Sequence, residues 1–299
     1  MRSTPSAYAS TRPARPPSAA DPERLARIAR RLRDQVVSQR FKLPMLPSAI
    51  DTLLGVAVDP NSSVKQLEGA IATEPMIAAR VVMAANSALY NSRGSVRSLH
   101  QAALRLGCMT LRDLVTQAIA EAHVFNGRPR SVLARLRDHS IAVAHLTRFT
   151  CALTDGDEQY AFLCGLLHNI GHPILLDLLE RDPPGERLHT HERQELCDLL
   201  HTLIGERVAR AWGLPELVIE VCRYHHCYLG SDEDERSGIL SGMNTMVAAA
   251  DRLACHLGMG DRKRAGSIET DPIWEALALD EVRRTALLDH ATMVVAALR

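Results

Sequence analysis

Apolar residues recur along the chain at the spacing of amphipathic helices. In the clearest case Leu25, Ile28, Leu32 and Val36 fall on one face of a helix, and arginines occupy its other sides. No segment alternates apolar and polar residues over the length of a strand, and no pair of such segments is joined by a hairpin signal. The pattern therefore predicts an all-α protein, a bundle of many helices without a sheet.

Residues typical of helix starts and stops divide this pattern into short helices joined by short loops. Proline, serine, threonine or aspartate precedes many apolar segments, and glycine or asparagine follows several of them. One long apolar segment is interrupted by Gly171-His172-Pro173, where we expect a break. The predicted helices cover residues 21–40, 48–58, 63–71, 75–85, 98–106, 110–123, 132–153, 158–179, 193–212, 215–224, 238–257, 272–279 and 281–298.

Composition shifts along the chain predict its organisation. Residues 1–20 are rich in Pro, Ser, Ala and Arg and lack apolar periodicity, so we expect a disordered tail. A basic amphipathic helix follows over residues 21–40. We expect it to join the next helices in a compact subdomain that ends at about residue 125. A second helical subdomain begins at about residue 131 and packs on the first, and residues 236–299 form a C-terminal helical extension.

Composition limits the class of protein and its compartment. Hydrophobic residues make up 46% of the chain and aromatic residues only 4%, so Leu, Ala, Val and Ile must fill the core. Seven cysteines without a Cys-x-x-Cys pair indicate reduced thiols and hence a cytoplasmic protein. No apolar run approaches the roughly 20 residues that span a bilayer, and the N-terminus lacks the apolar segment of a secretory signal.

Zero net charge hides an uneven distribution of charged residues. Residues 1–42 carry ten Lys or Arg and three Asp or Glu, which makes this segment +7 and the remainder −7. A basic segment of this kind can contact phosphates or a membrane surface. The alternative is a solvated helix face, or one that docks on the acidic body of the same protein. We favour the second interpretation and do not expect nucleic acid to be the partner.

Histidines supply the candidate chemistry. His139, His168, His201 and the adjacent pair His225-His226 lie on separate predicted helical segments, and Asp251 lies on a later one. A single histidine on an apolar helix is usually a core residue bonded to a carbonyl. Imidazole and carboxylate groups that converge in one pocket, however, are ligands of borderline divalent metals. The residue after His168 is Asn169, which offers a neutral amide oxygen instead of a carboxylate.

The order of these residues resembles the metal-ligand order of the HD superfamily of phosphohydrolases. The wider context resembles one branch, the HDOD (HD-related output domain) proteins of bacterial signalling, over about residues 41–235. The motifs that carry this second resemblance are Leu43-Pro44-Met45-Leu46-Pro47, Asp59-Pro60, Glu74-Pro75, Ala85-Asn86-Ser87-Ala88, Gln101-Ala102 with Leu106-Gly107, the stretch Gly165-Leu166-Leu167-His168-Asn169-Ile170-Gly171, Trp212-Gly213-Leu214-Pro215, and His225-His226. Glu74 replaces the aspartate usual in the family.

The resemblance implies roles for the candidate residues. His139, His168 and Asp251 match the ligands of a first metal, and His201, His225 and His226 match those of a second. Asn169 stands where the superfamily has an aspartate. Two divalent ions about 3.5–4 Å apart repel by on the order of 17–19 kcal/mol at an effective dielectric of 20, so anionic ligands are needed. With Asp251 as the only anion among the seven positions, we expect a degenerate site that holds at most one ion of Fe, Mn or Zn.

Two functions follow from this resemblance. The first is a regulatory output module of bacterial signal transduction that binds a protein partner or a nucleotide-type small ligand, without catalysis. The second is a metal-dependent phosphohydrolase or phosphodiesterase with residual activity. Relatives that cleave cyclic di-GMP carry Gly-Tyr-Pro after the histidine pair, whereas here the pair runs into Cys227-Tyr228-Leu229-Gly230. This difference favours the first function. His172 is a further candidate, either as a ligand or as a residue that supports one.

Overall fold

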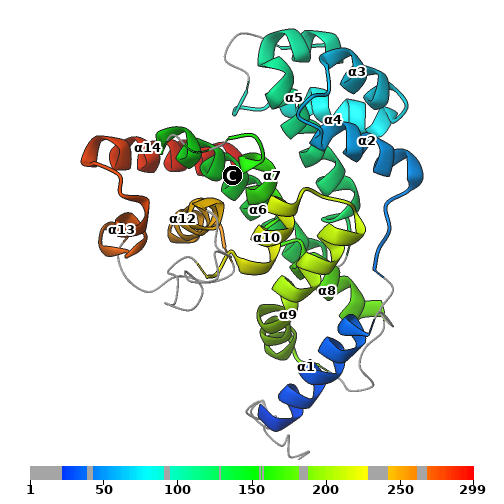
Figure 1. The fold of residues 1–299 in the computed structure, drawn as a ribbon, viewed down its shortest axis with the longest axis vertical. Coiled ribbons are helices and arrows are strands. Elements are labelled where there is room, and N and C mark those ends of the chain that lie inside the picture. The colour runs from blue at the N-terminus through cyan, green and yellow to red at the C-terminus, as the bar shows by residue number, and fades with distance from the viewer. Residues whose placement is uncertain are drawn as a thin grey trace, which may run out of the picture.

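Helices are the only regular elements in the described part of the chain (Figure 1). The computed structural model describes residues 22–38, 43–90, 95–127, 129–154, 156, 158–181, 188–227, 242–260 and 268–299. The predicted all-α fold is therefore confirmed. The tail predicted over residues 1–20 and the start of the C-terminal extension, residues 236–241, lie outside the described residues.

Most predicted helices are present with bounds that shift by a few residues. In chain order they are α1 (Pro22–Val37), α2 (Ser48–Val58), α3 (Val64–Ala72), α4 (Pro75–Ala85), α5 (Leu99–His123), α6 (Arg130–Leu153), α7 (Ala161–Leu167), α8 (Gly171–Arg181), α9 (Thr190–Ala211), α10 (Glu216–Tyr224), α12 (Gly242–His256), the 3-10 turn η1 (Ile268–Thr270), α13 (Ile273–Leu277) and α14 (Glu281–Leu298).

Helix α5 combines two helices that the sequence separates. Gly107 lies inside it with φ 79° and ψ 169°, a conformation that side chains rarely adopt, so the helix is kinked at this residue. The sequence signal for a stop at Gly107 was therefore correct, but the chain resumes the helix at once. The part of α5 that follows Gly107 buries Leu111, Leu114 and Val115 in the core.

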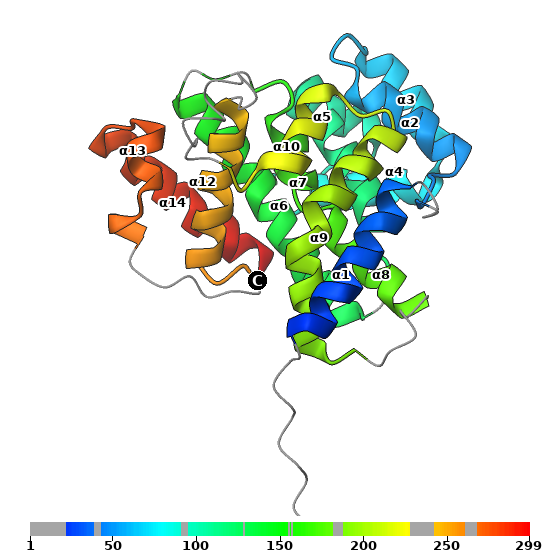
Figure 2. The same ribbon diagram turned by 60° about the horizontal axis from the view of Figure 1, so that its bottom comes forward.

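Helix α6 is the centre of the bundle. Helices α7, α12 and α14 all pack against it, so the C-terminal extension forms part of the same body (Figure 2). Helices α2 to α4 pack around α5 at one end of the molecule. Arg148 of α6 donates to Asp113 of α5 at 2.5 Å, which ties the two groups together.

Helix α1 lies along α9 (Figures 1 and 2), and Figure 1 shows it at the opposite end of the molecule from α2 to α5. The expectation that it joins the N-terminal subdomain was therefore wrong. Its four predicted core residues are buried, at 2–8% exposure. The Arg24 guanidinium pairs with the Glu192 carboxylate of α9, and Glu192 is only 2% exposed. The basic helix thus docks on the body of its own chain. This agrees with the interpretation of its charge that we favoured from the sequence.

Two sequence motifs far apart in the chain meet at the C-terminal end of α9. Residues 43–47 form no helix or strand, as the prolines at 44 and 47 favour. The indole N–H of Trp212, at the end of α9, donates to the carbonyl of Pro44 at 2.8 Å. This hydrogen bond holds the segment between α1 and α2 against the second subdomain.

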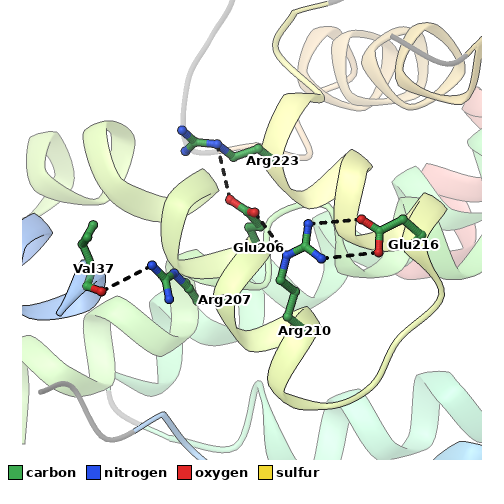
Figure 3. Close-up of polar contacts among 6 residues, drawn as sticks. All are labelled: Val37, Glu206, Arg207, Arg210, Glu216 and Arg223. Atoms are coloured by element: carbon green, nitrogen blue, oxygen red, sulfur yellow. Dashed lines mark hydrogen bonds and ion pairs between the residues drawn. The ribbon is translucent and has the colours of Figure 1, made fainter. Parts of the chain in front are cut away.

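The C-terminal end of α9 carries a group of surface ion pairs (Figure 3). Arg210 contacts Glu206 and Glu216, with its shortest distance, 3.1 Å, to Glu216 Oε1. Arg207 donates to the last carbonyl of α1, at Val37, with a distance of 3.5 Å. Exposed pairs of this kind contribute roughly 0–1 kcal/mol each, so the buried face of α1 dominates its attachment.

One stretch reaches the length and hydropathy of a membrane span, contrary to the expectation that no apolar run does so. Residues Ala161–Glu180 have a mean hydropathy of 1.4 over a qualifying window. This stretch comprises α7 and most of α8 with the break between them, and 78% of the window is buried in the protein. Its apolar character is therefore accounted for by its position in the core.

We expect Arg24→Ala to lower the free energy of unfolding by about 2–3 kcal/mol, because it leaves the buried Glu192 carboxylate without its counter-ion. Urea denaturation measures this loss. Arg33→Ala, on the exposed side of the same helix, is the matched control and should change stability by less than about 0.5 kcal/mol. Equal effects of the two substitutions would contradict the importance assigned to this ion pair.

Candidate metal centre

Two glycines position the central stretch of the sequence. A Cβ atom at Gly165 would lie 2.6 Å from the Cα of Ala144, so α7 approaches the backbone of α6 closely. A Cβ atom at Gly171 would lie 1.9 Å from the carbonyl oxygen of His201, so α8 approaches α9 even more closely. Glycine alone permits both contacts. His168 and Asn169 lie in the break between these two anchored helices.

All of the histidines singled out in the sequence lie in one continuous cluster. Ring centroids are 5.4 Å apart for His139 and His168, 5.1 Å for His168 and His225, and 5.4 Å for His201 and His225. His226 lies 4.1 Å from His225 by the same measure. His226 is exposed, whereas the other four rings are buried, so the cluster reaches the surface at one end.

Four of these imidazoles are oriented by main-chain carbonyls. In each case Nδ1 faces a carbonyl oxygen, which can only accept, so Nδ1 carries the proton and Nε2 carries the lone pair. The same second contact orients most metal-binding histidines in proteins. The Nδ1 partners are Met259 for His139 (2.5 Å), Gly165 for His168 (2.7 Å), Cys197 for His201 (2.9 Å) and Val221 for His225 (3.0 Å).

Several atoms in this region are buried without a hydrogen bond. They are Nε2 of His168, Nε2 of His225 and the amide oxygen of Asn169. Leaving a buried acceptor unsatisfied costs roughly 1–3 kcal/mol. These three acceptors lie on two adjacent residues and on a histidine whose ring contacts one of them. They fit a cation-binding site, because a metal ion bonds to such lone pairs.

Burial also keeps the imidazoles neutral. Burial, together with neighbouring imidazoles, lowers the pKa of His168 to about 3 and that of His201 to about 2. Burial, with the charges of His226 and His168, lowers the pKa of His225 well below its usual value. Neutral imidazole is the form that binds metals, so His168, His201 and His225 are in their ligand form at neutral pH.

The donor atoms form two groups with the spacing of metal ligands. His139 Nε2 lies 3.2 Å from Asp251 Oδ1, and Cys255 completes a group of three donors within 4.8 Å of one another. His201, His225 and His226 form the second group, with His201 Nε2 at 3.0 Å from His226 Nε2. Each pair places two potential acceptors face to face, so a proton or a metal ion must lie between them. The residues fit a divalent ion in either group.

The two groups differ in negative charge. The group of three imidazoles contains no anion, and Asp251 is the only carboxylate among the seven predicted positions. Asn169, the position that matches the superfamily aspartate, contributes an uncharged amide. The whole cluster can therefore coordinate a cation through nitrogen lone pairs, but it offers little charge to balance two ions at once.

Sequence reasoning missed one donor, Cys255, and left the role of another, His172, open. Cys255 follows Asp251 by four residues on α12, a spacing that places two side chains on the same helix face. His172 stacks on His201 with ring centroids 4.2 Å apart, and its Nε2 lies 3.6 Å from Asp198 Oδ1. His172 therefore supports His201 from the side of α8 and links the cluster to a second carboxylate.

The all-α fold and its buried histidine cluster resemble those expected of the HD superfamily. The sequence profile of the HDOD domain matches residues 43–228, and the chain therefore belongs to the HDOD family. This confirms the resemblance drawn from the motifs. Asp251 and Cys255 lie beyond the matched segment, on the C-terminal helices that pack on α6.

Relatives of this chain are distant and longer. A protein of Treponema pallidum (strain Nichols) is 26% identical over 202 residues, which make up 62% of this chain and 37% of that protein. Ribonuclease Y of Thermus thermophilus is 29% identical over 154 residues, or 52% of this chain and 21% of that enzyme. The chain thus spans about a third of the first relative and a fifth of the second.

Solved structures confirm the fold. An HDOD domain protein from Geobacter sulfurreducens has a TM-score of 0.68 at 21% identity, over 93% of this chain and 98% of that one. A proposed metal-dependent phosphohydrolase from Shewanella amazonensis has a TM-score of 0.70 at 20% identity, over 93% of this chain and all of the other. At this identity the comparison concerns the fold alone.

We expect Gly171→Ala to destabilise the protein by at least about 3 kcal/mol, because its Cβ would overlap the carbonyl of His201 and push α8 away from α9. Gly69→Ala is the matched control, because it lies on an exposed face of α3 with no atom within 4 Å of a new Cβ. The control should stabilise the protein by about 0.5–1 kcal/mol. Urea denaturation distinguishes the two, and a mild effect of Gly171→Ala would contradict the close contact.

We also expect metal-free protein to lose stability as the pH falls from 7 to 5. The folded-state pKa values of His168, His201 and His225 lie below the ordinary value near 6.5, so the unfolded chain binds more protons below that pH. Stability is therefore complete above about pH 6.5 and declines by up to about 1.4 kcal/mol per pH unit for each histidine.

Urea denaturation at a series of pH values, in the presence of a chelator, measures this slope. His201→Asn removes one of the three groups and should make the slope shallower by about 1.4 kcal/mol per pH unit. A constant free energy of unfolding between pH 7 and 5 would mean that the imidazoles are not held neutral by burial.

Proposed function

We propose that the protein is a regulatory output module of bacterial signal transduction, in which a single divalent ion supports the fold and catalysis has been lost. The observation that carries this proposal is the charge of the site. The imidazoles keep the orientation of metal ligands, but Asn169 supplies an amide where the superfamily has a carboxylate. Compared with the superfamily pattern, the metal-binding histidines are present and the site has one carboxylate fewer.

A divalent ion supplies hydrolytic chemistry by acidifying a bound water, and two ions together also stabilise the leaving oxygen. By the family resemblance His139, His168 and Asp251 would hold one ion; of these, His139 and Asp251 lie in one group of close donors, and His201, His225 and His226 form another that offers an alternative place for it. The role of Asp251 is to neutralise charge, and the four carbonyl-bonded Nδ1 atoms keep the rings turned inward. Fe, Mn or Zn fits the mixture of nitrogen and oxygen donors.

The partner on this proposal is another signalling protein, with a nucleotide-type small ligand as the alternative. Membership of the HDOD family supports the signalling role. Nucleic acid is not proposed as the partner; the pairing of Arg24 with Glu192 takes one basic residue of α1 out of such a role. A cytoplasmic location is part of the same proposal, and it is supported by seven cysteines of which none forms a disulfide.

A metal-dependent phosphohydrolase is the second candidate. The four carbonyl-oriented imidazoles favour it, because this arrangement serves catalytic as well as structural metals. The names of two relatives, a ribonuclease and a proposed metal-dependent phosphohydrolase, make phosphate diesters the substrate class to test.

Elemental analysis of the purified protein, wild type beside Asn169→Asp, tests the proposal. We expect about one divalent ion per chain in the wild type and an increase toward two in the variant, because the new carboxylate offsets the repulsion between two ions. The same preparations, supplied with Mn²⁺ or Fe²⁺, are then assayed on a cyclic dinucleotide, an RNA oligonucleotide and an aryl phosphate ester.

The two candidate functions give opposite results in that assay. The regulatory module should show no turnover by the wild type above that of metal in buffer. Turnover by the wild type that His168→Ala abolishes would overturn the proposal in favour of the phosphohydrolase, provided that circular dichroism shows the variant to be folded. Absence of bound metal in both wild type and Asn169→Asp would remove the ion from the proposal.

A further inference from the structure

Cys255 is the third donor of the group that also contains His139 and Asp251. We propose that its thiolate, together with Asp251, His139 and His168, forms a closed four-ligand site that selects zinc or another thiophilic metal. This inference rests on the proposed function, because it identifies the metal of the same site and explains why that metal is structural. Nothing in the motifs of the family assigns a cysteine to this role.

Local helix geometry brings the two anions together. Asp251 and Cys255 are one turn apart on α12, and their Oδ1 and Sγ atoms are 3.6 Å apart. In the absence of metal the thiol donates a weak hydrogen bond to the carboxylate. The chain also leaves room for the sulfur, because a Cβ at residue 260 would lie 2.8 Å from Sγ, and glycine occupies that position.

The distances agree with those between ligands of one tetrahedral ion. Metal–ligand bonds of about 2.0–2.3 Å place neighbouring tetrahedral ligands roughly 3.3–3.8 Å apart. His139 Nε2 and Asp251 Oδ1 are 3.2 Å apart, and Asp251 Oδ1 and Cys255 Sγ are 3.6 Å apart. All three donors lie within 4.8 Å of one another, so one ion can contact each of them.

His168 provides a second, independent indication of a ligand. Its side chain is fully enclosed, at 1% exposure, and its Nε2 atom has no hydrogen-bond partner. Its ring lies 5.4 Å from that of His139, centroid to centroid. His168 is not one of the three donors that lie within 4.8 Å of one another. Its unsatisfied buried lone pair is accounted for if the ring turns toward the bound ion and supplies the fourth bond.

Charge explains why sulfur belongs in this site. Asn169 removes one anion relative to the superfamily pattern, and a Cys255 thiolate restores one. A divalent ion with one carboxylate, one thiolate and two neutral imidazoles is electrically balanced. Thiolate ligands favour zinc over magnesium or manganese, and four protein ligands leave no position for a reactive water.

Cobalt(II) substitution tests the proposal, because sulfur bound to cobalt gives an intense charge-transfer absorption in the near ultraviolet. We expect this band when metal-free wild-type protein takes up cobalt, and we expect Cys255→Ser to lack it. Competition with a chelator should show that the same variant binds zinc at least about ten-fold more weakly. Cys108→Ser, at a half-buried thiol on α5, is the matched control and should behave as wild type.

A measurement on the wild type alone guards against a variant that fails to fold. Zinc should slow the alkylation of Cys255 by iodoacetamide and leave the alkylation of Cys108 unchanged. Mass spectrometry measures both rates. Cobalt uptake without a sulfur band and unprotected Cys255 would overturn the inference and leave the single-ion proposal intact. Failure to take up any metal, or metal-dependent turnover of a phosphate diester, would overturn both.

Discussion

The histidine cluster depends on two backbone contacts in which glycine is required because no side chain fits. Gly165 lets α7 lie against α6, and Gly171 lets α8 lie against α9. These contacts fix both ends of the break that contains His168 and Asn169. Neutral imidazoles attract one another weakly, and protonated ones repel, so the histidines cannot assemble the cluster themselves. Backbone packing brings them together, and the main-chain carbonyls then set which nitrogen faces inward.

This assembly has an energetic cost that the fold must offset. Buried Nε2 atoms without hydrogen bonds each cost roughly 1–3 kcal/mol, and burial of the rings removes the option of protonating them. A core made only for stability would replace such groups by apolar side chains. The retention of several unsatisfied acceptors around one point therefore indicates a cation-binding site. The same argument does not distinguish a catalytic ion from a structural one, because both satisfy lone pairs equally well.

Local features of the fold were predictable from the sequence, and long-range choices were not. The buried face of α1 follows from the three-to-four residue spacing of Leu25, Ile28, Leu32 and Val36, which is a property of one helix. Its partner does not follow, because an apolar face fits α9 as well as it fits α5. Gly107 was a correct signal for a break, although resumption of the helix depends on packing. Residues 161–180 resemble a membrane span by composition, and only their burial in the bundle explains them.

In the candidate site too, some residues were predictable from the sequence and others were not. Its imidazoles could be named from order and family resemblance, because those residues lie in motifs. Cys255 could not be found in that way, since a search for paired cysteines ignores a thiol whose partner is a carboxylate one helical turn earlier. That omission affected the charge balance as well as the ligand set. Counting Asp251 alone leaves a cation with too little negative charge, whereas counting the thiolate gives a balanced site for one ion. On the proposed function, an amide at residue 169 and a thiolate ligand at residue 255 would both oppose hydrolysis, because the first disfavours a second ion and the second would occupy the position that water needs.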